Sequence, residues 1–185
     1  MKIHVFGASG TGTTTLGQAL GTYLGLPYYD TDHYFWLPTE LPFSQRRPAA
    51  ARDALLAQDL TQTPSWLLGG SLAGWGEQWL AAFDLAIFLW LPPALRLARL
   101  QQRELARYGA ALHDDPVCAA QLRTFLDWAA GYDDSSSGGH RTFANHTDWL
   151  TRCTCPVLEL RGDLSVAERV ARVHARLHEL GYPIK

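Results

Sequence analysis

Residues 2–15 read KIHVFGASGTGTTT, and this stretch decides the fold class. The stretch 2–6, which becomes apolar at Ile3, has the length of a strand, and the residues from Thr13 onward have helical periodicity. Between them lies the turn Gly7-Ala8-Ser9-Gly10-Thr11-Gly12-Thr13-Thr14. A glycine-rich turn between a strand and a helix offers converging backbone N–H groups and a positive helix end, which together bind phosphate. The stretch therefore predicts a phosphate-binding unit of the G-x-x-x-x-G-K-[ST] type.

One position departs from that motif, because Thr13 stands where the motif has lysine. The lysine reaches the β- and γ-phosphates, and a charge-assisted hydrogen bond is worth about 1.5–3 kcal/mol. We expect nucleotide binding or transfer to be weaker by about one to two decades unless an arginine compensates. The Thr14 hydroxyl is placed to bind Mg²⁺. The residues expected to contact the nucleotide phosphates are Gly7, Ala8, Ser9, Gly10, Thr11, Gly12, Thr13, Thr14 and Thr15. The alternative is a glycine-rich turn without a ligand.

The remainder of the chain alternates short apolar runs with helical periodicity, which predicts βαβ units and a parallel sheet. Residues 31–47 read as an irregular excursion rich in aromatics and prolines. The closing helix begins with a capping box formed by Ser165 and Glu168. The expected strands are 2–6, 26–29, 66–68, 85–91 and 157–160. The expected helices are 13–24, 48–60, part of 72–83, 94–107, one opened by Pro116, 145–150 and the closing helix.

Composition narrows the class of protein. A chain of 185 residues suits a single domain, 1–185. A formal charge of -2 argues against a broad surface for nucleic acid or for an anionic membrane. No apolar run approaches the roughly 18 residues of a membrane span. Three cysteines, with Cys153 and Cys155 too close for a zinc half-site, favour plain thiols in a reducing compartment. We therefore expect a cytoplasmic protein.

With the phosphate turn, the pair Arg99 and Arg103, and the last strand and helix, the chain resembles the adenylate-kinase-like small P-loop kinases. These include shikimate and gluconate kinases and a branch of adenylate-kinase-related or DNA-topology-modulation proteins. The resemblance implies an α/β P-loop NTPase fold with three layers, in which helices cover both faces of a five-stranded parallel sheet. It also implies an acceptor-binding region at about 31–62, a helical lid at about 108–149, and ATP or another NTP with Mg²⁺.

The resemblance also implies roles for particular residues. In the R-x-x-x-R motif one arginine lies on adenine and one touches phosphates, and the four-residue spacing of Arg99 and Arg103 puts both on one helix face. A solvated basic face continued by Arg96 and Arg107 is the alternative. The sequence Asp30-Thr31-Asp32 resembles the D-x-D of shikimate-type kinases, which makes Asp30 a Mg²⁺ ligand with Thr14 and makes Asp32 the group that orients the acceptor hydroxyl. On an extended segment both carboxylates would face one pocket. The alternative is a turn pair that caps the segment after it.

Two further residues fall in the expected lid. Arg141 and His146 would reach phosphates when the lid closes, so Arg141 joins Asp32 and Arg103 as an expected catalytic residue. Adenylate kinases usually carry an aspartate where this chain has Gly69, with an arginine soon after, and neither is present. A nucleoside monophosphate is therefore disfavoured as acceptor.

We predict a small-molecule kinase that transfers a phosphoryl group from ATP–Mg²⁺ to a small acceptor, with neither nucleic acid nor membrane as a partner. ATP and GTP both remain open as donors. The rival prediction is a nucleotide-binding sensor or regulator without transfer activity, which Thr13 favours. A slow NTPase is a third possibility.

Overall fold

A computed structural model describes residues 1–40, 42–109 and 114–183 of the chain. The strands are β1 (Lys2–Gly7), β2 (Tyr28–Asp30), β3 (Trp66–Gly69), β4 (Leu85–Trp90) and β5 (Val157–Arg161). The helices are α1 (Thr13–Leu24), α2 (Thr31–Phe35), α3 (Ala49–Thr61), the 3₁₀ helix η1 (Glu77–Ala82), α4 (Pro93–Tyr108), α6 (Pro116–Ala130), α7 (Phe143–Arg152) and α8 (Val166–Glu179).

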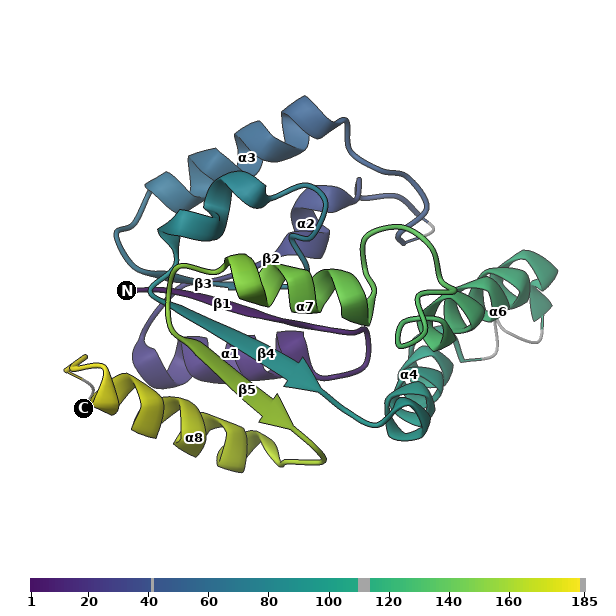
Figure 1. Cartoon of the computed structure of the whole chain (residues 1–185). Helices are drawn as coiled ribbons and strands as arrows, with labels where there is room; N and C mark the ends of the chain where they lie inside the picture. Colours follow the sequence, from purple (N-terminus) through teal and green to yellow (C-terminus); the bar gives the residue numbers. More distant parts are fainter. Residues whose placement is uncertain (41, 110–113, 184–185) are drawn as a thin grey trace.

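The five strands form one parallel sheet in the order β2-β3-β1-β4-β5 (Figure 1). This is the sheet that the alternating sequence pattern predicts, and the predicted fold class is confirmed. The strand order places β1 in the centre, between β3 and β4. The turns after β1, β2 and β3 therefore meet at the carboxyl edge of the sheet, where open α/β sheets bind their ligands.

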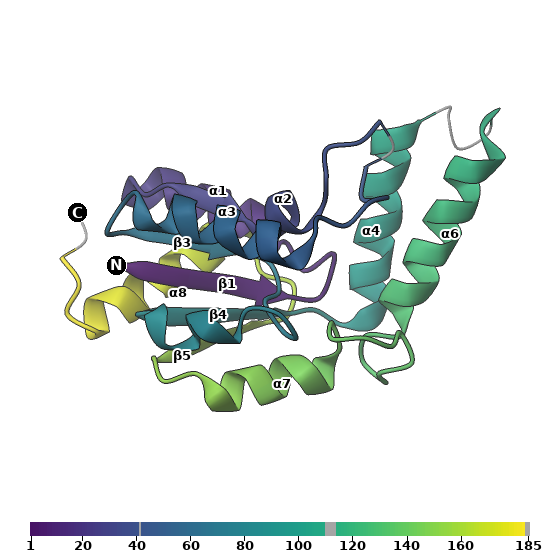
Figure 2. The same cartoon turned by 90° about the horizontal axis from the view of Figure 1, so that it is seen from above.

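Two apolar layers hold the sheet between helices. On one face α1 and α8 pack through side chains that include Leu16, Leu20, Val173 and Leu177. On the other face α2, α3 and α7 pack through residues such as Tyr34, Leu56 and Trp149 against strand residues such as Phe88. Helices α4 and α6 lie side by side beyond the carboxyl ends of the strands (Figures 1 and 2). The sheet edge that carries the phosphate turn thus faces the pair α4 and α6.

Two sequence-based expectations need revision. The segment 31–47 is not wholly irregular, because α2 occupies its start and an isolated antiparallel bridge joins Trp36 to Arg46. The expected lid, 108–149, runs into α7, where His146 and Trp149 are fully buried against the sheet. This packing restricts the proposed lid to the part of the chain that precedes α7. None of the helices in the described residues combines the length and the apolar character needed to cross a bilayer.

Candidate functional site

The phosphate turn leads directly from the central strand into α1. Gly10 and Gly12 adopt φ angles of 87° and 93°, which side chains rarely tolerate. The Thr11 hydroxyl and its backbone N–H both donate to the Ala8 carbonyl, at 2.8 and 3.1 Å. These bonds close the turn on itself. The predicted phosphate-binding unit therefore has a preformed backbone at the N-terminus of a twelve-residue helix.

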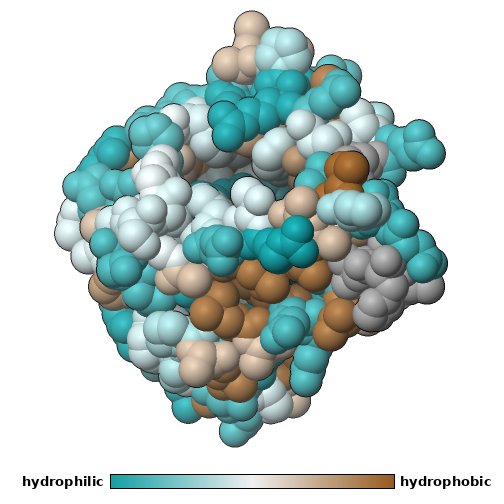
Figure 3. All heavy atoms as spheres, turned by 90° about the vertical axis from the view of Figure 1, so that its right-hand side faces the viewer, coloured by the Kyte–Doolittle hydropathy of each residue, from teal (hydrophilic) through white to brown (hydrophobic). Residues whose placement is uncertain are grey.

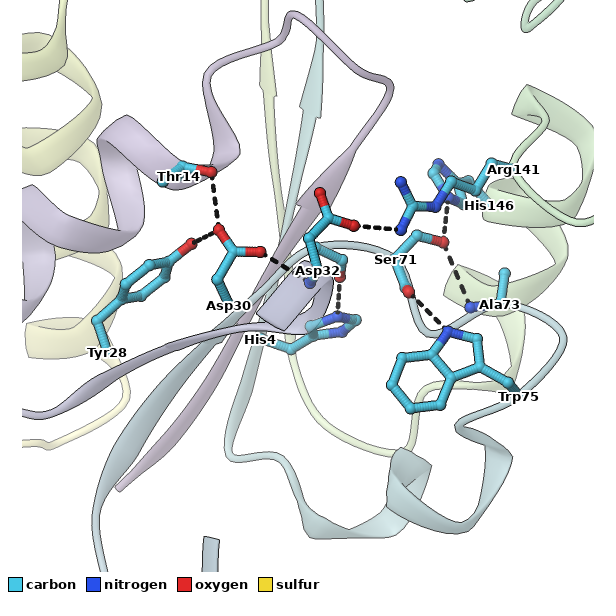
Figure 4. Close-up of polar contacts among 11 residues, drawn as sticks. His4, Thr14, Tyr28, Asp30, Asp32, Ser71, Ala73, Trp75, Arg141 and His146 are labelled. Atoms are coloured by element: carbon cyan, nitrogen blue, oxygen red, sulfur yellow. Dashed lines mark hydrogen bonds and ion pairs between the residues drawn. The ribbon is translucent and has the colours of Figure 1, made fainter. Parts of the chain in front are cut away.

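Asp30 joins the end of β2 to the phosphate turn. One of its carboxylate oxygens, Oδ2, accepts hydrogen bonds from the Thr14 hydroxyl at 2.9 Å and from the Tyr28 hydroxyl at 3.0 Å (Figure 4). The other oxygen accepts from the Asp32 backbone N–H at 3.0 Å and so caps α2. The expectation of an extended D-x-D segment is wrong, because Asp32 lies in the first turn of a helix. Asp30 therefore both caps α2 and accepts a hydrogen bond from Thr14.

Thr14 and Asp30 suit a magnesium ion. A hydroxyl and a carboxylate, 2.9 Å apart, are the oxygen ligands that Mg²⁺ prefers, and in kinases this ion commonly takes one or two protein ligands with phosphates and water. Within the described residues no cluster of three or more His, Cys, Asp or Glu side chains has the geometry of a metal site. The donor set present fits an ion that arrives with a nucleotide.

The ring of Tyr28 is packed between two glycines. A Cβ atom at Gly17 of α1 would lie 2.1 Å from the ring, and one at Gly69 of β3 would lie 2.1 Å from its hydroxyl oxygen. Burial, and then the charge of Asp30, raise the pKa of Tyr28, so the hydroxyl stays protonated and donates to that carboxylate. The two glycines thereby position the tyrosine that orients Asp30.

Asp32 and Arg141 meet although 109 residues separate them in sequence. The Arg141 guanidinium donates to the Asp32 carboxylate at 2.9 Å, and both side chains remain partly exposed (Figure 4). Arg141 lies between α6 and α7. Two of the three expected catalytic residues are therefore in direct contact.

A cavity of about 1570 Å³ connects the phosphate turn to this pair. Ser9, Thr14, Asp30, Asp32 and Arg141 all line it. Figure 3 looks onto the side where α4 and α6 lie and shows a hollow bordered by hydrophilic and hydrophobic side chains. The other arginines that line the cavity are Arg46, Arg47, Arg52, Arg103 and Arg107, and its aromatic residues include Phe35, Trp36, Trp75, Phe125 and Trp128.

The arginines of α4 are already engaged by other groups of the chain. Arg99 forms an ion pair with Asp163, in the loop that precedes α8. Arg103 donates to Glu104 at 2.7 Å and lies over the ring of Phe125 in the cavity wall. Each guanidinium thus has a carboxylate partner already. The alternative of a solvated basic face is wrong for Arg96, which is 1% exposed and bridges α4 to the Ala129 carbonyl and to Asp133.

His146 is not in a lid and does not reach the cavity. It is fully buried, and its two ring nitrogens are hydrogen-bonded with Ser71 and Tyr132, each at 2.8 Å. Burial, followed by the charges of Arg141 and His4, lowers the pKa of His146 to about 3. The expectation that it touches phosphates is wrong, and the residue is a neutral link between α7, the end of β3 and the segment after α6.

Arg169 of α8 is a residue of this site that the sequence analysis missed. Its guanidinium Nη1 donates to the Thr11 carbonyl at 2.7 Å, and the side chain is 4% exposed. The signal was present in the sequence. Arg169 precedes Val173 and Leu177 at four-residue spacing, which makes it a charged residue on the buried stripe of an amphipathic helix.

No protein-family model matches the chain. The uncharacterized protein YqaC of Bacillus subtilis (strain 168) is 43% identical over 172 residues, which are 93% of this chain and 94% of that protein. The shikimate kinase of Aquifex aeolicus aligns with a TM-score of 0.56 and 16% identity, over 98% of each chain. The shikimate kinase of Bacteroides thetaiotaomicron gives the same TM-score and identity over 96% of this chain and 98% of its own. These structural likenesses show that the fold is that of the small P-loop kinases.

Proposed function

The chain belongs to the family of Bacillus subtilis YqaC. From its fold, which is that of the small P-loop kinases, we propose that it is a small-molecule kinase. The donor is ATP or another NTP with Mg²⁺, and the acceptor is a small molecule with a hydroxyl group. One observation carries the proposal. Ser9 and Thr14 of the phosphate turn line one cavity together with Asp30 and Asp32, so that the proposed donor and acceptor groups open onto one space.

Each residue has a defined task in such a transfer. The backbone from Gly10 to Thr14 holds the nucleotide phosphates, and the oxygens of Thr14 and Asp30 hold the Mg²⁺ that neutralises phosphate charge. Asp32 orients the acceptor hydroxyl and accepts its proton as the hydroxyl oxygen bonds to the γ-phosphorus and the bond to the β-phosphate oxygen breaks.

The arginines of the cavity support an acceptor that also carries an anionic group. Arg141 is held by Asp32, whereas Arg52 stacks on Trp75 at 4.2 Å from the ring centroid. A carboxylate or phosphate on the acceptor would compete for Arg141 and leave the Asp32 carboxylate to the hydroxyl. The aromatic walls favour an acceptor with a flat or apolar part.

Thermal shift with and without Mg²⁺ is the first test, with ATP, ADP and GTP and then a panel of hydroxylated organic acids. A ligand at 100 times its Kd adds about 2.7 kcal/mol of stability, which is readily measured. Absence of any nucleotide shift at millimolar concentration would refute the proposal.

Two aspartate variants then separate the proposed roles. Asp32→Asn should leave nucleotide affinity nearly unchanged and lower transfer by about 10²–10⁴-fold. Asp30→Asn should instead reduce the Mg²⁺ dependence of nucleotide binding. If both variants only lower the melting temperature, the two residues serve as a capping pair and the roles assigned to them are wrong.

Thr13, which stands where the motif has lysine, favours a second candidate, a nucleotide-binding sensor without transfer activity. In that case nucleotide binds and no acceptor is phosphorylated by the wild-type protein. A slow NTPase differs from both, since it releases phosphate from ATP with water alone. Phosphate release measured with and without the acceptor panel distinguishes the three.

A further inference from the structure

We infer that Arg169 supplies the positive charge that the phosphate turn lacks at Thr13. The inference rests on the proposed nucleotide binding and assigns a phosphate-positioning role to a residue of the last helix. It also replaces the expectation that an arginine of α4 compensates, because Arg99 and Arg103 each pair with a carboxylate.

The first support is the position of Arg169. Its Nη1 atom donates to the Thr11 carbonyl at 2.7 Å, within the turn itself. The same atom would lie 3.0 Å from a Cβ at Gly12, where φ is 93°. The absence of a side chain at Gly12 therefore lets a guanidinium from another element approach the backbone that would hold phosphates.

The second support is that Arg169 is a buried cation without a counter-ion. The side chain is 4% exposed, and among the described residues no carboxylate forms a salt bridge with it. Its Nε atom is buried and has no hydrogen-bond partner there. Buried charges in proteins are normally paired, since desolvating an isolated ion is costly. An anion bound at the turn would provide the missing counter-charge.

The third support is the charge balance around the turn. Burial lowers the pKa of Arg169, the nearby charge of Arg99 lowers it further, and Asp163 opposes both. Asp163 is itself paired with Arg99. Asp163 is therefore shared between Arg99 and Arg169, and it offsets the charge of Arg169 beside the turn only in part.

Two substitutions at Arg169 distinguish an electrostatic role of its charge from a purely structural role of its hydrogen bond. Arg169→Gln keeps an amide donor and removes the charge, whereas Arg169→Lys keeps the charge. Titration calorimetry with ADP and with inorganic tripolyphosphate should show about a 10- to 100-fold loss of affinity in Arg169→Gln and a smaller loss in Arg169→Lys. Arg172→Gln, which removes an exposed arginine three residues further along α8, is the matched control and should stay within about twofold of the wild type.

A second-site lysine tests compensation directly. Thr13→Lys should restore most of the affinity lost in Arg169→Gln and should add much less to the wild type. If Arg169 only holds the Thr11 carbonyl in place and has no electrostatic role, Thr13→Lys should not restore the affinity. Circular dichroism melts confirm that each variant is folded, and Arg169→Met, which also removes the charge, replaces Arg169→Gln with and without Thr13→Lys if the glutamine variant does not fold.

The outcomes separate this inference from the proposed function. If the wild type binds neither probe nor ATP, the proposed function fails and the inference fails with it. If the wild type binds and Arg169→Gln matches Arg172→Gln, the inference alone is wrong. It is equally wrong if Thr13→Lys raises affinity by the same factor, within about twofold, in both backgrounds.

Discussion

Acid should destabilise this protein through His146, which is buried between Ser71 and Tyr132. Its pKa falls from an ordinary value of 6.5 to about 3 on folding. Between these values the unfolded chain binds a proton that the folded chain excludes, so the stabilisation is complete above pH 6.5 and is lost as the pH falls toward 3. A pKa difference of one unit corresponds to about 1.4 kcal/mol. Lowering the pH from 7 to 5 should therefore reduce the free energy of unfolding by about 2 kcal/mol through His146 alone.

His4 adds to the same effect. It is fully buried, and burial lowers its pKa to about 4 despite a hydrogen bond with the Gly70 carbonyl, which acts in the opposite direction. The cost of moving from pH 7 to pH 5 is again about 2 kcal/mol. The wild type should thus lose about 4 kcal/mol through the two histidines, which is a large part of the roughly 5–15 kcal/mol typical of a folded domain.

Urea unfolding at pH 7 and pH 5 measures this loss, and His146→Gln removes one of the two titrating groups. The substitution lowers stability at both pH values, so the informative quantity is the difference between them, which should shrink by about 2 kcal/mol. His178→Gln replaces an exposed histidine and should leave the difference as in the wild type. An unchanged difference in His146→Gln would refute the assignment of His146 as a neutral buried residue.

Three other predictions concern packing and motion. Gly17→Ala should lower the free energy of unfolding by about 1–3 kcal/mol, because its Cβ would lie 2.1 Å from the Tyr28 ring; a change within about 0.5 kcal/mol in urea unfolding contradicts this. Arg96→Met should lower the free energy of unfolding by about 3–5 kcal/mol, because it leaves Asp133 and the Ala129 carbonyl without their hydrogen-bond donor. An unchanged melting temperature would show that the packing of α4 against α6 does not depend on Arg96. In hydrogen exchange, ADP should increase protection in residues 131–141 and leave the buried α7 as it was, whereas equal protection in both states argues against a lid.

Much of the fold could be predicted because its signals are local. The glycine-rich turn, the apolar strands and the capping box of Ser165 and Glu168 each depend on residues close together in sequence. The helix predicted at 13–24 is found as Thr13–Leu24, and the capping box is present. The short helix α2 was missed because the signal for its start is ambiguous. Asp30 caps the helix, but an aspartate at this position is equally typical of a metal ligand.

The site was harder to predict because its contacts are long-range. The pairing of Asp32 with Arg141 spans 109 residues, and no local pattern encodes it. His146 was misassigned for a related reason, since a histidine in a polar stretch gives no indication that α7 folds back onto the sheet. Arg169 shows the opposite case. Its place in a buried stripe was visible in the sequence, but the Thr11 carbonyl it contacts lies 158 residues away.

The packing of Tyr28 between Gly17 and Gly69 links the evolutionary histories of three positions. A side chain at either glycine has room only after the tyrosine ring has been replaced by something smaller, and each contact lies on a different element of the fold. A smaller residue at position 28 removes this clash, so a side chain at Gly17 or Gly69 should be found together with the loss of the tyrosine. Relatives that lack the tyrosine should be the ones that tolerate alanine or serine at these glycines. They should also orient the carboxylate at Asp30 by a different donor, because the hydroxyl that donates to it would have gone with the ring.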